Sequence, residues 1–195
     1  MDIESCSRKN LSAKEKYRAV PTVFFSIDER QKKLLLLMRG VNLTEVELRK
    51  YLRRRGITGE RPIAESIAWS FDKPYSVGRF SDGSFPALYT SASRDICLSE
   101  VQHYLRPGQE REYIVYSILY SGSLRDVRPV SGSSGELLPE DHAGCQPIGK
   151  KCYLLGDEGI ITFSKRKAGG SNCVVFSESS VSEGAVIESV DVRAA

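Results

Sequence analysis

The second half of the chain is dominated by segments typical of β-strands. Residues 113–120, Tyr-Ile-Val-Tyr-Ser-Ile-Leu-Tyr, are β-branched or aromatic at most positions, and this composition favours an extended chain. Three more short apolar segments follow at residues 159–163, 173–176 and 185–192. Because the helical patterns lie earlier, strands and helices do not alternate regularly. We therefore expect an α+β fold, with a mixed or mostly antiparallel β core and flanking helices, instead of a doubly wound βαβ sheet.

One predicted helix carries a glutamate beside its apolar face. Ser93 can cap this helix, and side chains typical of a buried stripe then recur at three- and four-residue spacing, at Cys97, Val101, Tyr104 and Leu105. Glu100 falls next to this stripe, where a carboxylate needs a cation, a hydrogen-bond donor or a ligand. Arg79, in the turn-rich segment 78–86, is the candidate cation. An ion pair at the edge of the core and a ligand site both remain open.

Length and composition restrict the possible classes of protein. The chain has 195 residues, 41% of them hydrophobic, which is enough for one good core and too few for two ordinary domains. The formal net charge of +3 is too small for a nucleic-acid footprint by itself. The five cysteines form no C-x-x-C pair, which argues against a zinc site and against a complete disulfide framework. We expect no metal.

From the composition of the N-terminal region we expect no Sec-type export signal. This region is polar and charged, and the longest apolar run, residues 34–38, is far too short to span a bilayer. A cytoplasmic site of action is expected, and delivery by a secretion machine that needs no signal peptide stays open. Residues 1–16 are expected to be a flexible segment, with a single domain over residues 17–195.

The first half of that domain contains weaker signals. We expect a short strand at residues 23–27. We also expect a helix that opens on the capping-box pattern at Thr44, runs through about Arg55 and is closed by Gly56. The basic run Arg53–Arg55 at its end fits a solvated helix C-terminus better than a nucleic-acid site. Residues 57–77 are expected to form a packed loop or a short helix. Residues 121–144 are rich in Ser, Gly, Pro and acids and are expected to be a surface loop.

Several common chemistries do not fit the residues. The chain has no G-x-S-x-G elbow, no G-x-G-x-x-G fingerprint and no P-loop, and its only histidines are His103 and His142. The polar residues that remain near strands and turns are Arg18, Arg79, Tyr89, Glu100 and Ser164, with Arg166 nearby. Two arginines suit a pyrophosphate, a tyrosine offers a ring for stacking, and a shielded carboxylate can stabilise a developing cation. Together they indicate a dinucleotide whose glycosidic bond can break.

Three segments of the chain occur in a characteristic order. They are residues 17–21, Tyr-Arg-Ala-Val-Pro; residues 78–100, from Gly-Arg-Phe through Pro-Ala-Leu-Tyr to Glu; and residues 157–176, from Asp-Glu-Gly-Ile-Ile through Phe-Ser-Lys-Arg and Gly-Gly to Val-Val-Phe. In these segments the chain resembles the RES domain family, named for its arginine, glutamate and serine. It departs from that pattern at Ser81, where the family usually has asparagine. It also carries an insertion at about residues 22–75, and the insertion could form a lid or a partner-binding surface.

The resemblance implies a fold similar to that of ADP-ribosyltransferase toxins and an activity that degrades NAD. Such proteins are bacterial toxins that cleave the nicotinamide–ribose bond with water or phosphate, deplete NAD in the target cell, and are commonly neutralised by a protein antitoxin or immunity protein. NAD would be the substrate, and no cofactor is expected.

The same resemblance assigns roles to individual residues. Arg79 would hold phosphate or ribose, and Arg18 would be a second phosphate contact. Tyr89 would pack on the nicotinamide end. Glu100 would stabilise the oxocarbenium-like ribose, and Ser164 would form hydrogen bonds within the nicotinamide pocket.

Two alternatives stay open at this point. The first is transfer of ADP-ribose to a macromolecule. The second is a module without turnover that binds an acidic partner or nucleic acid through Arg53–Arg55 and Lys165–Lys167. For the NAD-degrading enzyme itself we expect no nucleic-acid partner and no membrane association. The acceptor, water or phosphate, and the oligomeric state are left undetermined.

Overall fold

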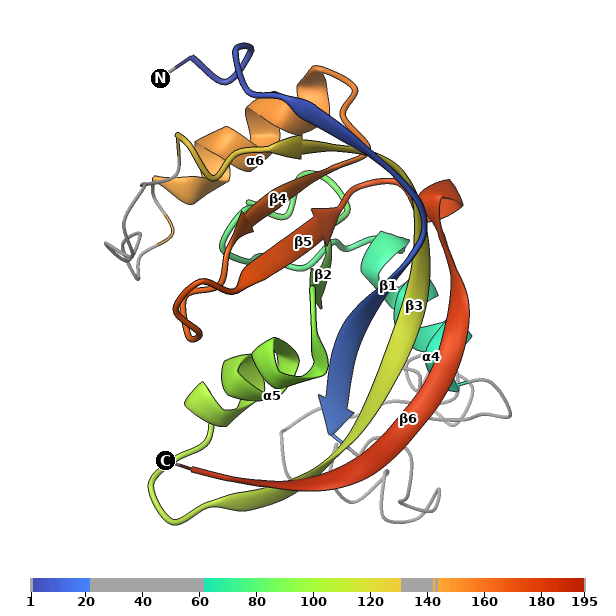
Figure 1. Ribbon diagram of the computed structural model, residues 1–195, viewed down its shortest axis with the longest axis vertical. Coiled ribbons are helices and arrows are strands. Elements are labelled where there is room, and N and C mark those ends of the chain that lie inside the picture. The colour runs from blue at the N-terminus through green and yellow to red at the C-terminus, as the bar shows by residue number, and fades with distance from the viewer. Residues whose placement is uncertain (1, 22–61, 131–141, 143, 195) are drawn as a thin grey trace.

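A computed structural model describes residues 2–21, 62–130, 142 and 144–194 (Figure 1). The elements in chain order are β1 (Arg8–Pro21), α4 (Pro62–Phe71), β2 (Leu88–Ser91), α5 (Arg94–His103), β3 (Glu110–Asp126), α6 (Cys145–Leu154), β4 (Gly159–Phe163), β5 (Ser171–Val175), the short 3-10 helix η1 (Glu178–Ser180) and β6 (Val181–Arg193). Three expectations lie outside the described residues: the strand at residues 23–27, the helix from Thr44 to about Arg55 with its basic run, and most of the insertion at 22–75.

The described strands form one six-stranded mixed sheet. Its order is β1-β2-β5-β4-β3-β6, and β1 also pairs with β3. Strands β1, β3 and β6 make a long curved layer beside the shorter strands β2, β5 and β4 (Figure 1). The two groups join where β3 runs parallel to β4, at Arg125 and Ile160, and where Tyr17 of β1 faces Ser91 of β2. Except for β3–β4, all pairings among these described strands are antiparallel, β1–β2 included, which confirms the predicted α+β class.

Strand β3 is longer than the apolar segment that predicts it. It continues through residues 121–126, which the sequence assigns to a surface loop, because Gly122 and Ser123 still pair with residues of β1. Its central side chains are deeply buried, and Val115 and Ile118 are fully inaccessible to solvent. β3 therefore connects both groups of strands and forms the centre of the fold.

The expectation of a flexible N-terminal segment is wrong for most of residues 1–16. Strand β1 begins at Arg8 and pairs with β3 from Arg8 opposite Arg125 to Pro21 opposite Tyr113. Before it, Ile3 and Cys6 are buried. The polar composition misled the prediction, because β1 is ordered by backbone hydrogen bonds to β3 while most side chains of its first half face solvent.

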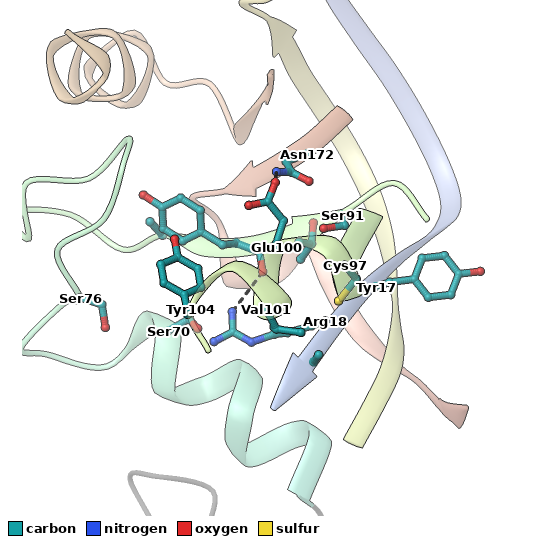
Figure 2. A pocket seen from close by; sticks show the side chains of 14 residues that line it. Tyr17, Arg18, Ser70, Ser76, Ser91, Cys97, Glu100, Val101, Tyr104 and Asn172 are labelled. Atoms are coloured by element: carbon teal, nitrogen blue, oxygen red, sulfur yellow. Dashed lines mark hydrogen bonds between the residues drawn. The ribbon is translucent and has the colours of Figure 1, made fainter. Parts of the chain in front are cut away.

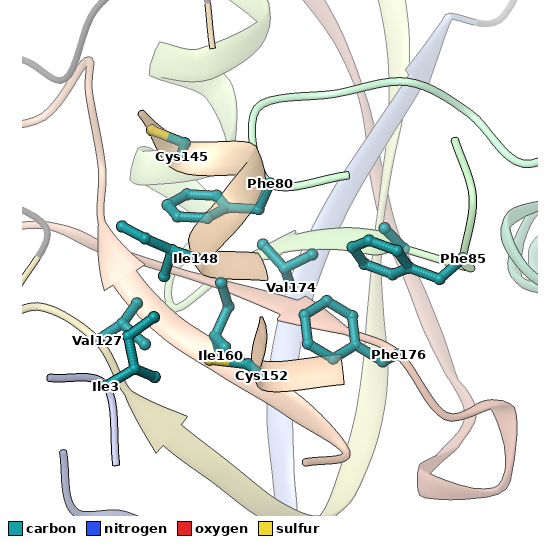
Figure 3. Close-up of a cluster of buried hydrophobic side chains, with 11 residues drawn as sticks. Ile3, Phe80, Phe85, Val127, Cys145, Ile148, Cys152, Ile160, Val174 and Phe176 are labelled. Carbon is teal, nitrogen blue, oxygen red and sulfur yellow. The ribbon is translucent and has the colours of Figure 1, made fainter. Parts of the chain in front are cut away.

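Helix α6 was not predicted, and it covers one face of the short strands. Its buried residues join a core cluster that includes aromatic residues of the 80–85 segment and strand residues (Figure 3); the cluster comprises Ile3, Phe80, Phe85, Ala87, Val127, Cys145, Ile148, Cys152, Ile160, Val174 and Phe176. Burial of Phe80 and Phe85, each 1% exposed, contributes about 2 kcal/mol per side chain. Pro147 and Gly149 obscured the helical pattern. Proline is tolerated in a first turn, and a Cβ at Gly149 would lie 1.9 Å from the Phe80 carbonyl oxygen.

A second core cluster lies where α4 packs on the sheet. Ile67 of α4 is buried among strand residues that include Leu88, Tyr116, Ile118 and Val175. The Ser66 hydroxyl and the Tyr116 hydroxyl share a buried hydrogen bond of 2.7 Å, so two polar groups are satisfied inside this cluster. The short helix considered for residues 57–77 is therefore present.

Helix α5 begins as its sequence predicts. The Ser93 side chain accepts a hydrogen bond from the backbone N–H of Ile96, and Cys97 is buried. Tyr104 is a correction, because its side chain is 75% exposed instead of buried. The helix ends at His103, and Tyr104 forms the C-cap, so the helical periodicity no longer places its side chain on the inner face. In the described residues no helix has the length and apolar character needed to cross a membrane.

Asp126, at the end of β3, predicts a pH dependence of stability. Its carboxylate accepts bonds from Arg128 Nε at 2.8 Å and Nη2 at 2.6 Å and from Lys9 Nζ at 2.7 Å, and the Arg128 bonds hold its pKa well below the usual value. A lowered folded-state pKa adds stability above the unfolded pKa of about 4, and this stability is lost as the pH falls further.

We expect Asp126→Asn to lower the free energy of unfolding by about 2 kcal/mol at pH 7, with a shrinking difference below about pH 4. Urea denaturation at pH 7 and pH 3 measures this. A difference that does not change with pH contradicts the assignment, and Asp72→Asn, at an exposed position, serves as the control.

Candidate active site

Two adjoining cavities meet at Glu100. The first, of about 280 Å³, is lined by Arg18 and Cys97 among others, and we call it the Arg18 chamber. The second, of about 450 Å³, is lined by Arg79 and residues of the β4–β5 region, and we call it the Arg79 chamber. The residues common to both walls are Ser76, Tyr89, Glu100, Tyr104 and Asn172. The carboxylate of Glu100 therefore lies at the junction of two open spaces.

One oxygen of the Glu100 carboxylate is held firmly and the other is not. Oε1 accepts hydrogen bonds from Ser164 Oγ at 2.7 Å and from Asn172 Nδ2 at 2.7 Å. Figure 2 shows the Glu100 side chain extending from α5 toward Asn172, with Arg18 in another part of the same cavity. Within the described ranges, Oε2 of Glu100 has no hydrogen-bond donor. The carboxylate is thus fixed in direction while one oxygen remains available to a ligand.

Ser164 lies directly after β4, and its hydroxyl makes all the hydrogen bonds that it can. The hydroxyl donates to Glu100 and accepts from the backbone N–H groups of Arg166 at 3.2 Å and Lys167 at 3.1 Å. A serine hydroxyl has one proton and two lone pairs, so its bonding capacity is filled. In this geometry Ser164 orients Glu100.

Arg79 lines its chamber without pairing with Glu100. Its Nη1 donates to the Phe163 carbonyl at 3.3 Å, and its guanidinium lies 5.2 Å from the centre of the Phe80 ring. Its Nε is buried without a partner. Among the described residues no ion pair of 4 Å or less joins Arg79 to Glu100. Of the two possibilities left open by the sequence, the structure shows an open pocket instead of a neutralised pair.

The turn that carries Arg79 is held from two sides. Gln146 of α6 donates from Nε2 to the carbonyls of Gly78 at 3.0 Å and Ser81 at 3.3 Å. From β2, the Tyr89 hydroxyl accepts from the backbone N–H of Phe80 at 2.9 Å. Burial raises the pKa of Tyr89 to about 12, so this phenol stays neutral. Tyr89 therefore lines both chambers and also positions the Arg79 turn.

This second role of Tyr89 can be tested with one substitution. Tyr89→Phe leaves the buried N–H of Phe80 without its acceptor, which costs about 1–3 kcal/mol of stability. Chemical denaturation measures the loss, and amide hydrogen exchange at Phe80 should become faster. Tyr17→Phe is the control, because among the described residues the Tyr17 hydroxyl bonds only the exposed Glu15 carboxylate, and its loss should cost little. Equal stability of Tyr89→Phe and the wild type would contradict this role.

Arg18 comes to the same site from a different direction. It lies on β1, donates from Nη1 to the Tyr89 carbonyl at 3.2 Å and lines the Arg18 chamber. Arg18 and Arg79 therefore flank Glu100 from separate chambers. The structure thus brings all five candidate residues, Arg18, Arg79, Tyr89, Glu100 and Ser164, to one region.

Other residues of the site were missed from the sequence. Asn172 binds Glu100, Gln146 holds the Arg79 turn, and Thr162 lines the Arg79 chamber. The only signal for Asn172 was its position directly before a strongly apolar strand. Thr162 gave no signal, since threonine is common in strands. Lys165, Arg166 and both histidines also line the Arg79 chamber.

The site offers no obvious metal ligands or activated thiol. In the part of the chain that the structure describes, no group of three or more His, Cys, Asp or Glu side chains is placed to hold a metal ion. Cys97 lines the Arg18 chamber, but burial raises the pKa of its thiol to about 12. This thiol stays protonated near neutral pH and is a poor nucleophile. The chemistry of the site therefore centres on Glu100.

Comparison with known protein families confirms the resemblance found in the sequence. A family model, the RES domain, matches residues 53–193. The chain belongs to the RES domain family. The match begins after β1, so Arg18 lies outside it and is linked to the site by the structure. No curated protein matches the chain at a significant level.

A solved structure has a similar fold. It is a chain of the crystal structure of the M. tuberculosis MbcT–MbcA toxin–antitoxin complex, with a TM-score of 0.52 and 18% sequence identity. The similarity covers 98% of this chain and 90% of that chain. At this identity the similarity shows the fold, and it supports the α+β architecture over nearly the full length of the RES protein described here.

Proposed function

We propose that this RES domain protein is a toxin that degrades NAD by cleaving the bond between nicotinamide and ribose. One observation carries the proposal. The Glu100 carboxylate has one oxygen fixed by Ser164 and Asn172 and the other available between two chambers. A negative charge fixed in advance at one point of a cavity suits a reaction in which positive charge develops on the substrate.

The reaction can be followed at the ribose carbon C1′. As the C1′–N1 bond breaks, its electron pair leaves with nicotinamide, which becomes neutral, and the ribose takes on oxocarbenium character. Glu100 stabilises that positive charge through Oε2. An acceptor oxygen then bonds to C1′: water loses a proton and gives ADP-ribose, whereas phosphate gives the phosphorylated product. Arginines on both sides of Glu100 suit a substrate that carries a pyrophosphate.

The proposal extends to a partner and a place of action. The similar solved structure is a toxin–antitoxin complex, and we propose that a protein antitoxin or immunity protein neutralises this chain. The cytoplasmic NAD pool would be its target.

Product analysis tests the function. Purified protein is mixed with NAD, with and without phosphate, and the products are separated by chromatography and identified by mass spectrometry. Free nicotinamide together with ADP-ribose or its phosphorylated form supports the proposal and identifies the acceptor. In a parallel incubation with labelled NAD, label that stays on protein would indicate ADP-ribose transfer instead. An unchanged NAD concentration with salt-sensitive binding of an acidic partner would favour the module without turnover.

A further inference from the structure

Three buried polar atoms near Glu100 make no hydrogen bond within the described residues. They are Arg79 Nε, Thr162 Oγ1 and Asn172 Oδ1, whereas a fourth such atom, Tyr120 Oη, belongs to the second core cluster. Because each of the three atoms is buried, its partner must come from the protein itself. Unpaired buried polar groups are costly and uncommon in folded proteins. Three of them beside one functional carboxylate indicate bonds that form in another state of the site.

Thr162 and Asn172 are placed to bond to each other. They are directly opposite in the antiparallel pairing of β4 and β5, so their side chains project from the same face of the sheet, with Cβ atoms about 5 Å apart. Rotation about the Cα–Cβ bond of Thr162 can aim its hydroxyl at the neighbouring amide. Asn172 Oδ1 can only accept, because Nδ2 of the same amide donates to Glu100 Oε1 at 2.7 Å. The Thr162 hydroxyl carries the proton that this oxygen lacks.

Arg79 can supply the donor that the Thr162 hydroxyl then needs. Its Nε carries one proton and can only donate. Its Nη1 donates at 3.3 Å to the carbonyl of Phe163, the residue next to Thr162, so the guanidinium already lies against this part of β4. That bond is long, and among the described residues no ion pair of 4 Å or less joins Arg79 to Glu100. The guanidinium can therefore turn when an anion binds it.

We propose that substrate binding closes a hydrogen-bond relay from Arg79 through Thr162 and Asn172 to Glu100. Arg79 Nε donates to Thr162 Oγ1, and the Thr162 hydroxyl donates to Asn172 Oδ1. Asn172 Nδ2 donates to Glu100 Oε1, as it already does in the free protein. The inference rests on the proposed function, because the pyrophosphate of NAD is the anion that turns Arg79. Thr162 and Asn172 are thus positioning residues, which act on the reaction through Glu100.

The relay links recognition of the substrate to the reacting carboxylate. Every proton in it points from the arginine toward Glu100, and an amide whose carbonyl accepts a hydrogen bond donates more strongly through its N–H group. The bond to Glu100 Oε1 therefore becomes stronger when the substrate is bound. Oε2, the oxygen without a donor in the described residues, is then held in one direction for the ribose.

Two hydroxyl deletions with opposite expected effects test the relay. Thr162→Val removes a hydroxyl that has no partner in the free protein, so the melting temperature should be unchanged or higher. Its kcat at saturating NAD should nevertheless fall about tenfold, the equivalent of one hydrogen bond, and Thr162→Ser, which keeps the hydroxyl, should retain kcat. The control is Ser180→Ala, which removes a buried hydroxyl that donates to Glu158 Oε1 at 2.8 Å and lines neither chamber. Its melting temperature should fall and its kcat should stay at the wild-type value.

A second measurement does not depend on turnover. ADP-ribose carries the pyrophosphate of NAD but has no nicotinamide to lose. Its addition to isotopically labelled protein should slow the hydrogen exchange of the Arg79 Nε–H group and shift the NMR signals of the Asn172 side-chain amide. Both responses should occur in the wild type and in Thr162→Ser, and both should be absent from Thr162→Val.

The outcomes separate the relay from the function on which it rests. Wild-type kcat in Thr162→Val, an equal loss of kcat in Thr162→Ser, a lower melting temperature of Thr162→Val, or responses to ADP-ribose that ignore Thr162 would each overturn the relay. Responses that depend on Thr162 in a protein that does not cleave NAD would refute the proposed function and keep the relay. Cleavage of NAD without any dependence on Thr162 would do the reverse, and the absence of both would refute both.

Discussion

Replacement of Glu100 by glutamine should lower the rate of NAD loss about a thousandfold while the protein remains folded. The glutamine carbonyl can still accept the bonds from Ser164 Oγ and Asn172 Nδ2 that now reach Oε1. The side chain would therefore keep its position and lose only its negative charge. Without that charge the developing oxocarbenium character of the ribose is not compensated. NAD consumption under saturating substrate and thermal unfolding should be measured on the same preparation.

The control for this variant removes a carboxylate elsewhere. Glu178 of η1 is exposed, and Glu178→Gln should turn over NAD at the wild-type rate. Full turnover by Glu100→Gln would refute the role of Glu100 and the function proposed from it. Loss of activity accompanied by unfolding would contradict the prediction that the variant keeps the native structure.

Replacement of Arg125 by methionine should lower the free energy of unfolding by about 3–5 kcal/mol. Arg125 is 5% exposed and binds both carboxylate oxygens of Asp157, with Nη2 at 3.1 Å from Oδ1. Its Nη1 also donates to the carbonyls of Ile3 at 3.1 Å and Cys6 at 3.3 Å. Methionine fills similar space but leaves the buried Asp157 carboxylate with one cation fewer. It also removes the hydrogen bonds that hold the turn at residues 3–6. Chemical denaturation measures the loss, and faster amide exchange of residues 3–9 should accompany it.

A double-mutant cycle separates charge from packing in this cluster. Asp157 keeps a second partner, Arg8 Nη2 at 2.8 Å, which limits the damage caused by Arg125→Met alone. Combining it with Asp157→Leu removes the uncompensated buried charge, and a large part of the lost stability should return. Additive losses in the double variant would contradict the view that the buried charge causes the effect.

Local signals in the sequence predicted the elements whose side chains alone favour one conformation. The strand at Gly159–Phe163 has its predicted bounds, and the Ser93 cap of α5 is confirmed, because β-branched runs and side-chain caps act over a few residues. Elements that depend on distant partners were missed. β1 is ordered by its pairing with β3. Helix α6 contains Pro147 and Gly149, and the glycine is needed because the Phe80 backbone carbonyl lies too close to leave room for a Cβ.

The sequence by itself determined the α+β class, the family motifs and the candidate residues Arg18, Arg79, Tyr89, Glu100 and Ser164, because these features depend on residue type and order. Only the tertiary structure decided how the side chains share their hydrogen bonds. Ser164 serves Glu100, Tyr89 supports the Arg79 turn, and Asn172 joins the site from β5. Donors and acceptors from different strands meet only after the sheet forms, and their directions follow from its register. For that physical reason the open oxygen of Glu100 and the unpaired atoms of the Arg79 chamber become visible only in three dimensions.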